Sequence, residues 1–149
     1  MEEGMYYRHS GHFGFGGLLA GLACGLLAGA PLAVAYSYGV LYIPIAGVVS
    51  LILSVVFGAL VGAAAGWGLR RGKVRNGKVA TFVAVIAGAV SHYFGWVVWV
   101  YAFLRRAEVD ASLSPLLLKP DLLWGIVVKI NAAGAWTIKG TTPTGWFLW

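Results

Sequence analysis

The chain has 149 residues, of which 60% are hydrophobic and 11% carry a charge. A soluble domain is about 45–50% apolar and about 25% charged, so this composition excludes a large soluble core and indicates one integral-membrane domain over residues 1–149. The net charge of +6 is compatible with nucleic-acid binding, but the largest basic cluster stands between two apolar stretches, where charges orient a membrane protein. We therefore expect a lipid bilayer, and no nucleic acid, as the partner of this chain.

Three stretches are long and apolar enough to cross a bilayer as helices. A helix needs about 20 apolar residues to span a hydrocarbon core of about 30 Å, and the segments 15–37, 40–69 and 79–104 meet this without an Asp, Glu, Lys or Arg. The tetrad Tyr36–Gly39 predicts a tight turn between the first two, which would form an antiparallel hairpin. We expect the first stretch to be retained, because the residues before it are more acidic than a signal peptide allows.

Small residues recur at every fourth position of these stretches. Four-residue spacing places them on one face of a helix, and in lipid the close approach of backbones is a main source of helix association. The pattern predicts a glycine-zipper hairpin that packs against the third stretch and against other copies or a partner. The helix-packing candidates are Gly17, Gly21, Gly25 and Gly29 in the first stretch, Ser54, Gly58, Gly62 and Gly66 in the second, and Gly88 in the third.

The loop over residues 70–78 sets the predicted orientation. Cytoplasmic loops of membrane proteins carry an excess of Lys and Arg. This loop holds no acid and five basic residues, which are Arg70, Arg71, Lys73, Arg75 and Lys78. We therefore expect a multi-pass protein of the inner (cytoplasmic) membrane with this loop and the N-terminus in the cytoplasm.

The C-terminal segment over residues 107–149 has a different pattern. Pro120 opens a stretch with apolar residues at 122, 123, 126, 127 and 130, which is the spacing of an amphipathic helix closed by Gly134. The charged residues in this stretch argue against a full crossing and favour a helix at the interface. Residues 136–140 predict a short strand that runs into a turn, as in a hairpin, and the last four residues, 146–149, resemble the first turn of a truncated fourth span.

His92 is the one ionisable residue deep in an apolar stretch. Such residues line ion and ligand pathways or form proton relays. The alternative is a histidine that is hydrogen-bonded at a helix interface, where such a bond contributes about 0.6 kcal/mol on average. We favour the structural interpretation, because the three stretches contain no carboxylate to act with it.

Other arrangements that carry chemistry are missing from the sequence. His9 and His12 lack a third ligand nearby, so we expect no metal site. The chain has only five acidic residues, all outside the apolar stretches, and no catalytic Ser/His/Asp pattern or CxxC motif. We therefore expect neither an enzyme nor a cofactor.

Three short motifs, Tyr6-Tyr7-Arg8-His9-Ser10-Gly11, Gly72-Lys73-Val74-Arg75-Asn76 and Gly145-Trp146-Phe147-Leu148-Trp149, together suggest a family. The chain resembles an uncharacterised family of small bacterial multi-pass membrane proteins with no assigned activity. The resemblance implies a further span after the last motif, and it implies no catalytic or binding residue.

Three functions fit these observations. The first is a structural or assembly component that associates through small-residue helix packing. The second is a small channel, a holin-like pore or a permease, with His92 lining the pathway. The third is a membrane anchor whose basic loop recruits a soluble partner.

Overall fold

The computed structural model describes residues 14–43 and 48–134, and these residues form five helices and no strand. The helices are α1 (Phe15–Tyr42), α2 (Val48–Arg71), α3 (Gly77–Arg106), α4 (Leu113–Leu118) and α5 (Pro120–Ala133). The first three are long and apolar enough to cross a membrane, which confirms the expected helical class with three candidate spans. The expected strand at 136–140, the last four residues and the pair His9 and His12 lie outside the described residues.

The predicted turn at Tyr36–Gly39 is wrong, because α1 continues through this tetrad to Tyr42. The buried hydroxyl of Ser37 lies 2.7 Å from two carbonyl oxygens, that of Ala33 one turn earlier and that of Gly95 in α3, and shares its single proton between them. These contacts hold the segment against α3 as a helix. In lipid every backbone polar group must find its partner inside the protein, so a helix persists where the same residues would form a turn in water.

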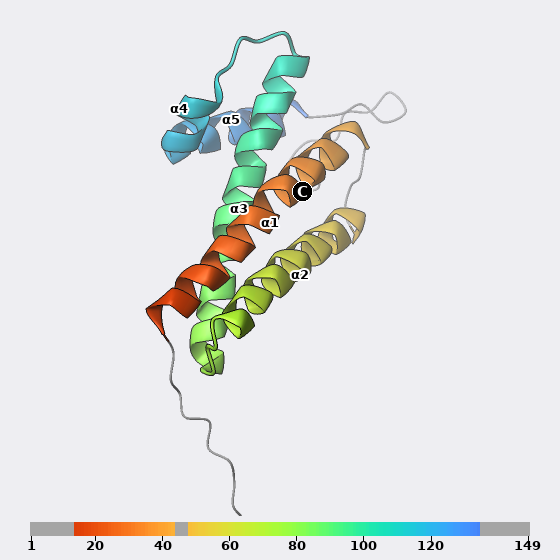
Figure 1. Ribbon diagram of the computed structural model, residues 1–149. Coiled ribbons are helices and arrows are strands. Elements are labelled where there is room, and N and C mark those ends of the chain that lie inside the picture. The colour runs from red at the N-terminus through yellow and green to blue at the C-terminus, as the bar shows by residue number, and fades with distance from the viewer. Residues whose placement is uncertain (1–13, 44–47, 135–149) are drawn as a thin grey trace, which may run out of the picture.

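The three long helices form a bundle in which α1 packs against both of its neighbours (Figure 1). Its buried face repeats every four residues from Gly17 to Ser37. The helices α2 and α3 meet near the turn that joins them and diverge toward their other ends (Figure 1). One core cluster, between these three helices, consists of Phe57 and four smaller side chains, which are Ala33, Val61, Ala65 and Ala87.

After α3 the chain folds back, and α4 and α5 pack beside the last turns of that helix (Figure 1). The helix α5 ends at Gly134, whose φ of 84° is the left-handed conformation that suits a glycine after a helix, so the predicted helix and its end are confirmed. Leu123, Val127 and Ile130 are buried in one cluster with residues of α3. The exposed side of α5 carries Trp124, which is 61% exposed, together with the charged Asp121 and Lys129, and this mixture supports the predicted interfacial position.

Candidate functional site

The glycines of α1 lie where two other helices approach its backbone. A Cβ added to Gly25 would lie 2.7 Å from the Cβ of Ala87 and 3.1 Å from that of Ala65. At Gly17 it would lie 2.5 Å from the carbonyl oxygen of Gly72. Gly21 and Gly29 are equally crowded, by the Leu69 side chain and by the Ser91 hydroxyl. This row therefore holds α1 against both α2 and α3 within one chain.

The glycines of α2 that continue the predicted row from Ser54 behave differently. Within the described residues, a Cβ added to Gly58, Gly62 or Gly66 meets nothing within 4 Å, and the same holds for Gly88 of α3. These three glycines of α2 therefore take no part in packing α2 against α1 or α3.

The helix α2 packs on α1 through a neighbouring face that the sequence reasoning missed. A Cβ added to Gly68 would lie 2.5 Å from the carbonyl oxygen of Ala20, and Gly72 directly contacts Gly17. The signal was present as a second set of small or apolar residues at helical spacing, formed by Val61, Ala65, Gly68 and Gly72. Two small-residue faces on one helix cannot be ranked from spacing alone.

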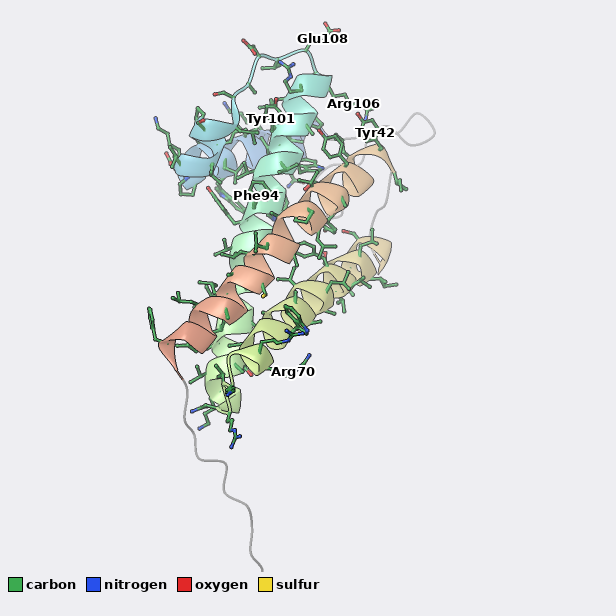
Figure 2. All side chains as sticks on the ribbon, in the orientation of Figure 1. Tyr42, Arg70, Phe94, Tyr101, Arg106 and Glu108 are labelled. Atoms are coloured by element: carbon green, nitrogen blue, oxygen red, sulfur yellow. The ribbon has the colours of Figure 1, made fainter. Side chains whose placement is uncertain are left out.

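The basic residues 70, 71, 73, 75 and 78 are exposed and gather at one end of the bundle, where α2 turns into α3 (Figure 2). The guanidinium carbon of Arg71 lies 4.6 Å from the centre of the Trp67 ring. At the opposite end, Arg106 donates to the carbonyl oxygen of Leu41 at 3.4 Å and covers the Tyr42 ring (Figure 2). The bundle thus has cations at both ends and an apolar middle, as a spanning protein requires.

A polar pocket of about 190 Å³ lies between α1, α2 and α3, in the half of the bundle away from the basic turn. Its polar lining comes from Tyr36, Ser50, Ser54 and His92, and Trp96 and Trp99 form aromatic walls. The hydroxyl groups of Tyr36 and Ser54 are 2.9 Å apart. Ser54 also donates to the carbonyl oxygen of Ser50 at 3.0 Å, so in this arrangement the Tyr36 hydroxyl is the donor to Ser54.

His92 is held by neighbours on its own helix and on α2. The indole N–H of Trp96 donates to Nε2 of His92 at 3.2 Å. A neutral imidazole has one donor and one acceptor nitrogen, so its proton resides on Nδ1. The ring of Phe57 lies 6.4 Å away between ring centres. This hydrogen bond joins two residues of α3, whereas the sequence suggested a bond from His92 to another helix.

The pocket offers hydroxyl groups, aromatic rings and one imidazole. Among the described residues that line it, none is acidic or basic apart from this imidazole. The described residues contain no group of three or more His, Cys, Asp or Glu side chains that could hold a metal ion. Comparisons with known proteins found no matching family model, no matching curated protein and no matching solved structure.

Proposed function

We propose that this chain is a structural or assembly component of the inner membrane, without catalytic activity, and that it associates with a second copy through α2. The observation that carries this proposal is the open row Gly58, Gly62 and Gly66, where a Cβ would meet nothing within 4 Å among the described residues. A glycine inside a helix costs about 0.5–1 kcal/mol relative to alanine. Three glycines at helical spacing offset that cost when another helix packs closely against the bare backbone and gains van der Waals contact.

The row has a defined position on the bundle. It continues the face of Ser54, which lines the pocket between α2 and α3. On α3, Gly88 lies one helical turn before His92, which lines the same pocket. The row runs from Ser54 toward the basic turn, and a helix of the second copy would pack along it.

The association is tested with Gly62→Leu, whose new side chain meets open space within the chain and so leaves the monomer folded. The matched control is Ala23→Leu, which adds bulk to an exposed position of α1. We expect sedimentation in a mild detergent to give a dimer or larger oligomer for the wild type and for Ala23→Leu, and a monomer for Gly62→Leu. An unchanged oligomer in Gly62→Leu contradicts the proposal.

The positions of the charges support the proposed orientation, with the basic turn in the cytoplasm and the loop after α3 outside. Five exposed cations stand at the first end. At the other end, the last turn of α3 before that loop holds two, Arg105 and Arg106. The asymmetry follows the positive-inside rule.

A small channel or permease is the second candidate, and the observation that favours it is the position of His92 on a polar pocket. Toward the basic turn the interior of one chain is filled, since Ala33, Val61, Ala65 and Ala87 are fully buried and Phe57 is 6% exposed. A pathway would therefore run between copies. Ion flux through liposomes that is lost in His92→Ala would support a channel, and the absence of flux at every pH would count against it.

A further inference from the structure

The pocket between α1, α2 and α3 has the size of a single six-membered ring. An apolar cavity of about 150 Å³ in a protein core holds one benzene molecule, and this pocket offers about 190 Å³. The indole rings of Trp96 and Trp99 meet edge to face at 5.9 Å between ring centres. Together with the Tyr36 ring they give the pocket aromatic walls, which suit a flat ligand.

The lining excludes charged ligands and selects one with oxygen atoms. Its polar groups are hydroxyls and a neutral imidazole, and a charged ligand at this depth would lack a counter-ion. Ser54 lies on α2 and His92 lies on α3, so polar groups are available on two walls. A ring with oxygens at opposite positions can be bonded from both.

The hydrogen-bonded pair of hydroxyls can serve either as a donor or as an acceptor. As the structure stands, Ser54 donates to the Ser50 carbonyl, and the Tyr36 oxygen keeps its capacity to accept from a ligand. If the Ser54 hydroxyl rotates toward Tyr36, the Tyr36 proton is released to donate to a ligand carbonyl. The same pair therefore accommodates a ring carbonyl and a ring hydroxyl.

The ligand reaches the pocket from the bilayer. His92 lies about 22 Å along α3 from Gly77, which places it inside a hydrocarbon core about 30 Å thick. Its side chain is exposed, and the pocket that it lines is partly open to the surroundings of the bundle. An apolar molecule dissolved in the membrane can enter through this opening.

We propose that this pocket binds the ring of a membrane-soluble quinone or hydroquinone. A quinone ring is flat, uncharged and soluble in lipid, and it has the size of the pocket. Its two oxygens accept hydrogen bonds as a quinone and donate them as a hydroquinone, which matches the pair of hydroxyls. The proposal concerns binding and is independent of self-association.

The test uses duroquinone (tetramethyl-1,4-benzoquinone) and durene, which is the same methylated ring without the two oxygens. Duroquinone has no free ring position for addition of the Cys24 thiol. Binding to the full chain in phosphatidylcholine nanodiscs is measured by equilibrium dialysis against empty nanodiscs. We expect saturable binding of duroquinone at one site per chain and binding of durene at least about fivefold weaker, the effect of one lost neutral hydrogen bond. Equal binding of the two rings, or no saturable binding of duroquinone, overturns the proposal.

Variants locate the site. Tyr36→Phe removes only the hydroxyl that meets Ser54, and it should weaken duroquinone binding about fivefold while durene binding stays unchanged. The matched control is Tyr38→Phe, the same change on an exposed side chain of the same helix, and it should bind duroquinone as the wild type does. Thermal unfolding without ligand verifies that both variants fold. Wild-type affinity in a folded Tyr36→Phe protein shows that the ring binds elsewhere.

Discussion

The substitution Gly25→Ala tests whether close backbone packing along α1 holds the bundle together. The added Cβ would lie 2.7 Å from the Cβ of Ala87 and 3.1 Å from the Cβ of Ala65. Carbon atoms in contact prefer about 3.5–4.0 Å. Neither neighbour can rotate away, because a Cβ is fixed to its backbone, so α3 must retreat by about 1 Å and α2 by about half as much.

The expected cost follows from two opposing effects. Overpacking of a filled core costs about 1–3 kcal/mol, while replacing glycine by alanine inside a helix contributes about 0.5–1 kcal/mol of stability. The difference spans about 0–2.5 kcal/mol, and because two fixed Cβ atoms are overpacked at once we expect Gly25→Ala to lower the free energy of unfolding by at least about 1 kcal/mol. Gly62→Ala meets open space, so only the gain of about 0.5–1 kcal/mol remains.

The assay is unfolding by sodium dodecyl sulfate in mixed micelles, followed by circular dichroism at dilutions where the protein is monomeric. The two variants carry the same chemical change on neighbouring helices, and the structure gives their effects opposite signs. If Gly25→Ala is as stable as the wild type, or more stable than Gly62→Ala, the contacts along α1 do not hold the bundle as argued.

Further predictions concern single side chains and the orientation of the chain. Ser37→Ala should cost about 0.6–1.7 kcal/mol in the same assay, because the change removes a buried hydroxyl that bonds to acceptors in α1 and α3. Ser91→Ala should be nearly neutral, because that buried hydroxyl has no hydrogen-bond partner among the described residues. Arg106→Gln should speed amide hydrogen exchange in the last turn of α1 about two- to fivefold. This factor corresponds to a loss of about 0.5–1 kcal/mol, because the variant lacks the bond to Leu41 and the contact with Tyr42. Exchange that requires global unfolding should not change. In a Cys24→Ala background, an impermeant maleimide should label Glu108→Cys on intact cells and Lys73→Cys only after permeabilisation; the reverse result inverts the orientation.

The three long helices could be predicted from composition, because an apolar run long enough to span a bilayer must satisfy its backbone hydrogen bonds internally, as a helix does. The ends of the helices could not. Tyr36–Gly39 reads as a turn by local propensity, yet it is helical because Ser37 bonds to α3 and lipid leaves no other partner for the backbone. The misplaced turn also concealed the pocket, since a tyrosine assigned to the headgroup region is not considered as a wall between helices.

The position of α5 was predictable for a different reason. Its apolar spacing and Gly134 define a helix with its end, and its charged residues argue against a crossing. The short helix α4 was not predicted, because its proline and six-residue length give no periodic pattern. Its place depends on tertiary contacts, such as the Tyr93 hydroxyl, which donates to the carbonyl oxygen of Leu117 at 2.9 Å.

The small-residue rows show what spacing can and cannot predict. A period of four identifies a face, and it did so equally for α1 and α2. It does not say which neighbour covers that face. The helix α1 has a neighbour on two sides, and its row is filled by Ala65, Ala87 and Ser91. The helix α2 lies at the edge of the bundle and needs only part of its circumference for α1, which leaves its second row open.

The open row begins one helical turn after Ser54, which lines the pocket, and this gives the two proposals a joint consequence. Ser54 ends the row at the pocket, and Gly62 lies two helical turns farther along α2. A second copy packed along the row would cover part of the route by which a ring enters from lipid. Duroquinone should therefore bind faster to the monomeric Gly62→Leu variant than to the wild-type oligomer, while Ala23→Leu keeps the wild-type rate. Equal binding rates in all three proteins would show that the packing surface on α2 does not cover the route into the pocket.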